Sequence, residues 1–302
     1  MMENVINQYL QYLCGADHVL RDEPLWKWTT FRVGGPAKFM VTVDDKKKLS
    51  RLISALNYLE YPYFVLGLGA NVLASDGGFD GVIIRLNFKE IYHNDQFVYA
   101  DAGAKLGVVI NYARDHGLSG LEWATGIPAT IGGGVYMNCG AFGSCMADVV
   151  AMVDIMDEHG AIKTLNANQI EYSYRHSVFM EQPAVIVGAY LRLQPGDPAQ
   201  IGQKMAEILQ SRQHHPKEPS AGSTFKRARD GFYVGREIEK LGLKGFQIGG
   251  AKVSEKHAGF IVNCDHATCD DVLKVIYHVQ DTVEAATGVV LETEVIFLGK
   301  ID

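Results

Sequence analysis

The chain has 302 residues, of which 47% are apolar and 21% charged, and its formal net charge is −7 at pH 7. This composition excludes disordered, collagen-like and coiled-coil proteins, and the acidic balance argues against nucleic acid as a partner. A chain of this length buries roughly three quarters of its unfolded surface, which favours two domains over one.

Helix and strand patterns alternate in the first half of the chain. Residues 3–14 predict an amphipathic helix that leads into a linking segment. The next elements are predicted as a strand, a helix capped by Asp44 or Asp45, and two strands: 37–43, 46–59, 63–66 and 82–86. A strand near 98–100 and a helix over 106–116 that ends at Gly117 follow. This order predicts a βαβ arrangement at the start of the fold.

Short strand patterns follow one another in the middle of the chain. They cover 149–156, 162–165 and 184–193. Because a turn at 158–160 joins the first two, this region predicts an antiparallel sheet.

A helix pattern over 198–213 separates this region from the rest of the chain. Pro216 and Pro219 follow it and indicate a domain boundary. Beyond the boundary we expect a helix that begins after Thr268 and is ended by Gly288, and then a final strand, over 269–286 and 289–298.

Glycine is concentrated in two segments. The chain has 32 glycines in 302 residues, a larger share than the ordinary one of about 7%. The excess lies between Gly117 and Gly143 and between Gly231 and Gly259. The second segment overlaps residues 213–260, which contain nine Lys and Arg residues but only five Asp and Glu residues. A small polyanionic ligand would suit this basic stretch, and a solvated face of mixed charge accounts for it equally well.

The five cysteines are Cys14, Cys139, Cys145, Cys264 and Cys269, and neither their odd number nor their spacing indicates a disulfide framework. We therefore expect a reducing compartment. Cys264, His266 and Cys269 have the residue types of a metal site, but the helix after Thr268 explains this segment, so no metal is expected. Without a long apolar run or a signal peptide pattern, the chain is predicted to be soluble and cytoplasmic, with no membrane partner.

A small-residue loop, Gly67-Leu68-Gly69-Ala70-Asn71-Val72, follows an apolar strand pattern. A dinucleotide-binding Rossmann fingerprint would have glycine in place of Val72 and a helix after it, and the sequence has neither. Small residues in such a loop leave backbone N–H groups accessible to an anion. The loop is therefore a candidate anion site, with an ordinary turn as the alternative.

The segment from Thr125 to Gly143 is long, nearly without charge and rich in small residues. Such a backbone can approach a large flat group closely. A buried glycine-rich packing strip is the alternative, but ordering so many glycines costs conformational entropy that a bound ligand would offset. The segment therefore favours a cofactor cradle.

These segments belong to a longer series of motifs. The first are Thr30-Phe31-Arg32-Val33-Gly34-Gly35-Pro36, the Gly67-to-Leu73 loop and the Gly126-to-Gly143 strip. The others follow in chain order: Tyr174-Arg175-His176-Ser177-Val178-Phe179, Ala221-Gly222-Ser223-Thr224-Phe225-Lys226, Gly245-Phe246-Gln247-Ile248-Gly249-Gly250-Ala251, His257-Ala258-Gly259-Phe260 and Leu291-Glu292-Thr293-Glu294-Val295. Together they resemble the family of UDP-N-acetylenolpyruvoylglucosamine reductases, also called UDP-N-acetylmuramate dehydrogenases, in its shorter subgroup that lacks an inserted tyrosine loop.

The resemblance implies an α+β fold with an FAD-binding domain of the vanillyl-alcohol-oxidase type, made of two subdomains, and a C-terminal α/β substrate domain. It places the N-terminal helix and link over 1–29, the FAD-binding domain over 30–197 and the substrate-binding domain over 198–302. The implied enzyme uses NADPH to reduce non-covalently bound FAD. It then reduces the enolpyruvyl ether of UDP-N-acetylglucosamine enolpyruvate to UDP-N-acetylmuramate, a peptidoglycan precursor. The expected partner is thus a UDP-sugar, and the expected state is a monomer or weak oligomer.

The implied chemistry requires particular side chains. Hydride addition at the terminal methylene leaves negative charge on the α-carbon and the adjacent carboxylate, so the site needs a cationic clamp and a proton donor. The resemblance assigns the clamp to Arg175, the proton donor to Ser223, and a protonated carboxyl that stabilises the enolic intermediate to Glu294. Glu292 shares a face with Glu294 on the predicted strand, so the choice between the two rests on the resemblance.

Two further sets of residues are expected to bind the ligands. Cofactor contacts are expected at Gly67, Gly69, Ala70, Asn71, Val72, Gly126, Ile127, Pro128, Thr130, Gly133, Asn138, Gly140 and Ala141. Substrate contacts are expected at Lys226, Arg227, Gln247 and Lys252, which gives the basic stretch a role. Because Arg227-Ala228 stands where the family often has Asn-Pro, we expect a different phosphate contact there.

Two other functions share parts of this pattern. An oxidase with covalently attached flavin would have the same fold, but the glycine strip contains no histidine for the attachment. A non-catalytic nucleotide-sugar binder would need neither the proton donor Ser223 nor the acid Glu294. A reductase acting on a carbon–carbon double bond is therefore the expected function.

Overall fold

The structure is a computed structural model that describes residues 2–182, 184–229 and 231–300. The chain forms two compact units. Unit 1 contains Met1–Arg21, Phe39–Gly67 and Gly81–Gln213, and unit 2 contains Asp22–Lys38, Leu68–Asp80 and His214–Asp302.

The units are not continuous in sequence. Two early segments, Asp22–Lys38 and Leu68–Asp80, pack with the C-terminal region, and Phe31, Val33 and Leu73 belong to its hydrophobic core. The helix over residues 198–211 belongs to unit 1. The functional domains expected at 1–29, 30–197 and 198–302 remain a prediction, and the compact units follow packing rather than chain order.

The α-helices of unit 1 are α1 (Met2–Cys14), α2 (Lys46–Tyr58), α3 (Leu106–Asp115), α4 (Ile131–Tyr136) and α5 (Pro198–Ser211). All except α4 are predicted from the sequence to within two residues. Asp45 caps α2, because its Oδ1 accepts the backbone N–H groups of Lys47 and Lys48 at 2.7 and 3.0 Å. Asp44, the alternative cap, instead pairs with the Lys48 ammonium at 2.8 Å.

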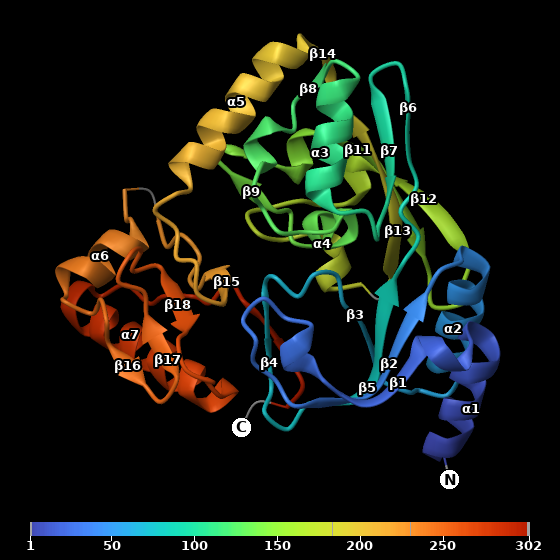
Figure 1. Cartoon of the computed structure of the whole chain (residues 1–302), viewed down its shortest axis with the longest axis horizontal. Coiled ribbons are helices and arrows are strands. Elements are labelled where there is room, and N and C mark those ends of the chain that lie inside the picture. The colour runs from blue at the N-terminus through green and yellow to red at the C-terminus, as the bar shows by residue number, and fades with distance from the viewer. Residues whose placement is uncertain (1, 183, 230, 301–302) are drawn as a thin grey trace. The chain divides into compact units, whose positions relative to one another are not determined.

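The main sheet of unit 1 is antiparallel, as predicted, with strand order β12-β11-β13-β7-β6 (Figure 1). Its strands are β6 (Ile91–Asn94), β7 (Phe97–Asp101), β11 (Val150–Met156), β12 (Ile162–Asn166) and β13 (Val185–Arg192). The helix α4 packs against β13 and β7. This packing places the glycine strip on a rigid sheet.

A second sheet has the order β1-β2-β5-β3. Its strands are β1 (Val19–Pro24), β2 (Pro36–Val43), β3 (Tyr63–Val65) and β5 (Phe79–Leu86). The elements β2, α2 and β3 follow one another in the predicted order, and β3 pairs in parallel with β5 rather than with β2. Two short pairs lie within unit 1: β8 (Leu118–Ser119) with β14 (Gln194–Pro195), and β9 (Gly140–Ala141) with β10 (Ser144–Cys145).

The glycine strip differs from a purely extended cradle. It contains the helix α4 and the first strand of the hairpin β9–β10, neither of which the sequence pattern predicts. Glycine has a low helix propensity, and three of the six residues of α4 are Gly132, Gly133 and Gly134. The helix forms because Thr130 caps it and because Ile131 and Val135 are buried in the core.

Unit 2 is built around an antiparallel sheet of order β15-β18-β17-β16. Its elements are β4 (Val72–Ala74), β15 (Ser220–Ser223), α6 (Val234–Lys240), β16 (Gln247–Ile248), β17 (Ala251–Val253), β18 (Phe260–Asn263), α7 (Cys269–Thr287) and β19 (Ile296–Leu298). The long helix α7 packs on β16, β17 and β18. Short 3₁₀ helices occur in both units, at Ala16–His18, Leu25–Lys27, Glu122–Ala124, Met146–Asp148, Ala167–Gln169 and Val178–Met180.

The ends of α7 follow the prediction, while the final strand is shorter than expected. The Thr268 hydroxyl accepts the Asp271 N–H at 3.0 Å, and Gly288 ends the helix at φ 69°. The strand expected over 289–298 covers only Ile296–Leu298, which pairs with β4 as β19. The backbone just before it, at Glu292 and Glu294, instead forms hydrogen bonds with the segment that follows β15. None of the helices in the described ranges is long and apolar enough to cross a membrane.

Candidate functional site

Two parts of the expected cofactor site meet in unit 1. A Cβ atom added to Gly67 would lie 2.7 Å from Thr130 Oγ1, so the start of the loop lies directly against the strip. The same Thr130 hydroxyl accepts the Gly133 N–H at 3.2 Å, and the Gly132 N–H donates to the Ala102 carbonyl at 2.9 Å. These contacts hold the backbone in place where a larger residue at position 67 would not fit.

The surface of the strip is accessible. Gly126, Pro128 and Gly133 are exposed, and Ile127, Gly140 and Ala141 are half-buried. A Cβ atom on Gly133 would meet only Thr130 Oγ1, at 3.4 Å. A strip whose main role was internal packing would be buried, so this exposure favours a binding surface.

Arg175 reaches the same strip. Its Nη2 donates to the Gly140 carbonyl at 2.9 Å, and its guanidinium carbon lies 5.1 Å from the centre of the exposed Tyr174 ring. The buried Asn138 joins the strip to the turn that carries Arg175, because its Nδ2 donates to the Ser173 carbonyl at 2.8 Å. The expected carboxylate clamp and the expected cofactor backbone are therefore brought together.

Three residues in this region have a left-handed backbone. The φ angles are 43° at Asn138, 53° at Phe142 and 55° at Arg175. Asparagine tolerates this conformation, whereas phenylalanine and arginine adopt it at a cost in energy.

In unit 2, Ser223 and Glu294 belong to neighbouring backbone segments. The Glu294 N–H donates to the Thr224 carbonyl at 2.8 Å, directly after Ser223. The Asn71 side chain donates from Nδ2 to the Glu294 carbonyl at 2.9 Å. The loop of the expected cofactor site thus fixes the backbone of the expected catalytic acid, a role for Asn71 that the sequence pattern does not predict.

The structure separates Glu294 from Glu292. The Glu292 side chain is 74% exposed, and its Oε2 pairs with the Lys226 ammonium at 3.3 Å. Glu294 is half-buried between the buried residues Leu291 and Val295. Position and burial therefore favour Glu294 as the functional carboxyl, and Lys226, expected at the substrate, contacts Glu292.

Ser223 shares a sheet face with two of the expected substrate residues. Ser223 pairs with Phe260, and Lys252 pairs with both Val262 and Gln247. Residues directly opposite one another, or two apart on a strand, point to the same side. Ser223, Gln247 and Lys252 therefore lie on the face opposite the core residues that pack with α7, while Arg227 is exposed in the segment after β15.

The remaining loop residues also lie in unit 2. The Gly69 carbonyl accepts the Thr30 N–H at 3.1 Å, Ala70 is half-buried, and Val72 opens β4. The candidate residues are thus divided: the strip and Arg175 lie in unit 1, and Gly69–Val72, Ser223 and Glu294 lie in unit 2.

A cluster of aromatic rings lies beside Ser223. The His257 ring lies 5.0 Å from Phe260 and 5.8 Å from His214 between ring centres, and its Nδ1 accepts the Gly259 N–H at 3.1 Å. Burial lowers the pKa of His257, and the neighbouring His214 adds to this effect. In the described ranges no three His, Cys, Asp or Glu residues are arranged to hold a metal ion. The ring contacts of His257 support a role in packing.

The half-buried His257 predicts a loss of stability in acid. Its pKa lies below the ordinary value of 6.5, so below that pH the unfolded chain binds more protons than the folded chain. The free energy of unfolding should therefore fall as the pH is lowered from about 7.5 to about 5.5, and His257→Gln should make this fall smaller. Unfolding by denaturant at both pH values measures this free energy, and His18→Gln, at an exposed position, is the control. An equal pH dependence of stability in all three proteins would refute the role given to His257.

Three residues near the candidate site are not predicted from the sequence. Arg212 and Phe142 are brought together by the fold, with the guanidinium carbon 5.2 Å from the centre of the ring, and no local motif contains both. Tyr174 directly precedes Arg175 in the sequence, and this adjacency could have indicated that Tyr174 lies near the site. A contact between residues as distant in sequence as Arg212 and Phe142 cannot be predicted from a local sequence pattern.

Known proteins resemble the chain over nearly its whole length. The family model described as "FAD binding domain" matches residues 37–166, and "UDP-N-acetylenolpyruvoylglucosamine reductase, C-terminal domain" matches residues 214–298. UDP-N-acetylenolpyruvoylglucosamine reductases from Caldanaerobacter subterraneus and Clostridium perfringens are 39% and 41% identical, covering 99% and 98% of this chain and all of theirs. The solved structure of the Thermus caldophilus reductase aligns with a TM-score of 0.80 and 34% identity, covering 93% of this chain and 98% of that one.

These matches confirm the expected α+β fold, an FAD-binding domain followed by a C-terminal domain. They extend over nearly the whole chain and exceed what a shared fold alone would give. The chain belongs to the UDP-N-acetylenolpyruvoylglucosamine reductase family.

Proposed function

We propose that the chain is an NADPH-dependent flavoenzyme that reduces UDP-N-acetylglucosamine enolpyruvate to UDP-N-acetylmuramate. Within the structure, the observation that carries this proposal is the hydrogen bond from Arg175 Nη2 to the Gly140 carbonyl, 2.9 Å long. It places a permanently charged guanidinium against the backbone expected to hold the cofactor. A carboxylate-bearing substrate bound there would lie close to the reacting cofactor.

The residues present in unit 1 fit FAD. The strip offers accessible backbone between Gly126 and Ala141 with no charged side chain, which suits a flat heteroaromatic ring. The buried Thr125 Oγ1 has no hydrogen-bond partner in the described part of the chain, so a polar ligand group could satisfy it. Gly67, Thr130 and Gly133 would hold the cofactor from the meeting point of loop and strip. When bound, FAD supplies the redox chemistry, because it accepts hydride from NADPH and returns it to the substrate.

Three side chains would act on the substrate. Arg175 binds the enolpyruvyl carboxylate through its planar fork and keeps its charge throughout. As hydride reaches the terminal methylene, protonated Glu294 stabilises the negative charge that develops on the enolic oxygen. Ser223 then donates its proton to the α-carbon, and solvent restores the serine hydroxyl. Overall, the reaction consumes one molecule of the enolpyruvyl substrate, one NADPH and one proton, and it produces one UDP-N-acetylmuramate and one NADP⁺.

Backbone contacts in unit 2 support these assignments. Glu294 is held at its N–H by Thr224 and at its carbonyl by Asn71, at 2.8 and 2.9 Å. Ser223 lies beside Thr224 on the same segment. Gln247 and Lys252, on the face shared with Ser223, and Arg227 are placed to bind the diphosphate of the UDP-sugar.

Two further properties are part of the proposal. We propose a monomer or weak oligomer that works in the cytoplasm. The five cysteines form no disulfide in the structure, which supports a reducing compartment. The absence of a membrane-spanning helix among the described residues is compatible with this location.

A visible spectrum tests the function. The purified chain, supplied with FAD, should be yellow, should lose its colour under anaerobic NADPH, and should release the flavin into the supernatant on acid precipitation. Protein that stays colourless after addition of FAD would overturn the flavoenzyme. Colour that stays with the precipitate would mean covalent flavin and favour the oxidase alternative.

A substitution at Gly67 should weaken cofactor binding. In Gly67→Ala the new methyl group would stand 2.7 Å from Thr130 Oγ1 and push the loop away from the strip. Forced contacts of this kind cost about 1–3 kcal/mol, which corresponds to roughly a 10- to 100-fold loss of FAD affinity if the cost appears in binding. Gly107→Ala is the matched control, since a Cβ there meets nothing within 4 Å. Equal FAD dissociation constants in the two variants would contradict the proposed meeting of loop and strip.

A further inference from the structure

Arg212 has an unusual environment in unit 1. It stands at the C-terminal end of α5, and its side chain is half-buried. Its Nε and Nη2 atoms are hidden from solvent and have no hydrogen-bond partner among the described residues. Buried guanidinium N–H groups without acceptors are costly, so a native chain that keeps them calls for an explanation.

Arg212 lies against both ends of the glycine strip. A Cβ atom on Gly126 would lie 3.0 Å from Arg212 Cδ and 3.4 Å from Nε. At the other end, the guanidinium carbon lies 5.2 Å from the centre of the Phe142 ring, which is 58% exposed and has the left-handed φ of 53°. The contacts with Gly126 and Phe142 place the guanidinium next to the backbone that would hold the cofactor.

The chain leading to Gly126 also carries side-chain atoms without polar partners. Trp123 Nε1 and Thr125 Oγ1, on the chain leading to Gly126, are buried without hydrogen bonds in the described part of the chain. Burial lowers the pKa of Arg212, because taking the guanidinium out of water disfavours its charged form. Among the described residues Arg212 has no carboxylate partner to compensate it. An anion bound at this point would provide the missing charge and acceptors.

We propose that Arg212 binds a phosphate group of the FAD diphosphate. Guanidinium and phosphate match in geometry, because the planar fork donates two parallel hydrogen bonds to two phosphate oxygens. Arg212 reaches the ligand by a change of side-chain conformation that releases Nε and Nη2 from their buried positions. This inference rests on the proposed function, because it presumes that the strip holds FAD.

The diphosphate of the UDP-sugar is the other source of the same chemistry. The cofactor is favoured because the residues that touch Arg212 belong to the strip rather than to the Ser223, Gln247 and Lys252 face. The two sources predict different defects: a cofactor contact changes the dissociation constant of FAD, and a substrate contact changes the KM for the UDP-sugar.

The experiment measures FAD binding to the full chain after flavin removal, by quenching of flavin fluorescence. Arg212→Gln should weaken FAD binding roughly 10- to 100-fold, the range expected for the loss of a charge-assisted hydrogen bond. Arg212→Lys should fall between wild type and Arg212→Gln, because it keeps the charge and loses the fork. Added salt should weaken FAD binding to wild type more steeply than to Arg212→Gln, because salt screens the ionic contact.

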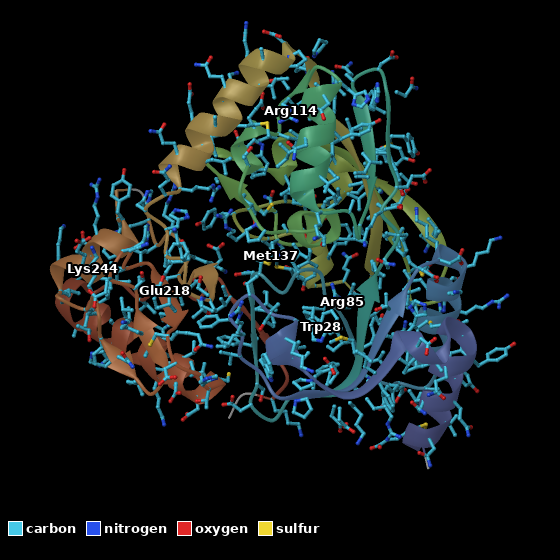
Figure 2. The ribbon with its side chains drawn as sticks, viewed as in Figure 1. Trp28, Arg85, Arg114, Met137, Glu218 and Lys244 are labelled. Atoms are coloured by element: carbon cyan, nitrogen blue, oxygen red, sulfur yellow. The ribbon has the colours of Figure 1, made fainter. Side chains whose placement is uncertain are left out.

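The matched control is Arg114→Gln on α3 (Figure 2). Arg114 lies in the same unit and pairs with Asp115 at 2.8 Å, so its loss should leave FAD binding unchanged. Unchanged FAD affinity in Arg212→Gln would overturn the inference, and a raised KM for the UDP-sugar alone would assign Arg212 to the substrate. Weaker FAD binding with an unchanged salt dependence would mean a structural role only. Failure of the wild type to bind FAD would instead overturn the proposed function.

Discussion

Ser223→Ala is expected to slow reoxidation of the reduced flavin by the enolpyruvyl substrate about 100- to 10,000-fold, the range of a lost general acid. Reduction of the flavin by NADPH should stay close to the wild-type rate, because that step transfers hydride and needs no proton on the α-carbon. Anaerobic stopped-flow absorbance separates the two half-reactions.

The control for this experiment is Ser220→Ala, which removes a hydroxyl from the same strand three residues earlier. Both half-reactions should be nearly normal in that variant. If Ser223→Ala slows NADPH oxidation as much as substrate reduction, the hydroxyl maintains the fold of β15 and is not the proton donor.

Glu294→Gln is expected to lower the rate of substrate reduction by about 100- to 1,000-fold, because the protonated carboxyl that stabilises the developing charge is lost. The amide has almost the same shape, so the backbone contacts to Thr224 and Asn71 should persist. The FAD dissociation constant and the rate of flavin reduction by NADPH should therefore change little. Half-reaction kinetics and fluorescence titration measure these quantities on one preparation.

Glu292→Gln is the matched control, two residues earlier in the chain. Its carboxylate is 74% exposed and pairs with Lys226, and exposed pairs of this kind contribute about 0–1 kcal/mol. This variant should reduce substrate at nearly the wild-type rate. A larger defect in Glu292→Gln than in Glu294→Gln would reverse the choice between the two residues.

The regular elements could be predicted because their signals are local. Lys46–Tyr58 has an apolar face and an aspartate before its first residue, and Thr268 and Asp271 mark the start of α7. The helix α4 could not be predicted, since its three glycines are poor helix formers and its stability comes from the core around Ile131 and Val135. Tertiary packing overrides local propensity there.

The candidate site could be predicted only in part. The motifs around Arg175, Ser223 and Glu294 identify the expected chemistry, and the resemblance gives each residue a role. Contacts between distant segments could not be predicted, because nothing in the sequence relates Asn71 to Glu294 or Arg212 to Phe142. Such contacts depend on how loops return to the sheets, and side-chain periodicity carries no information about that.

Single-turnover reoxidation tests the central claim most directly. The full chain with bound FAD is reduced by NADPH under anaerobic conditions, and UDP-N-acetylglucosamine enolpyruvate is then added. We predict that the visible flavin absorbance returns and that one UDP-N-acetylmuramate forms for each flavin reoxidised, as measured by mass spectrometry. Flavin that stays reduced with this substrate and regains its colour only in air would contradict the account.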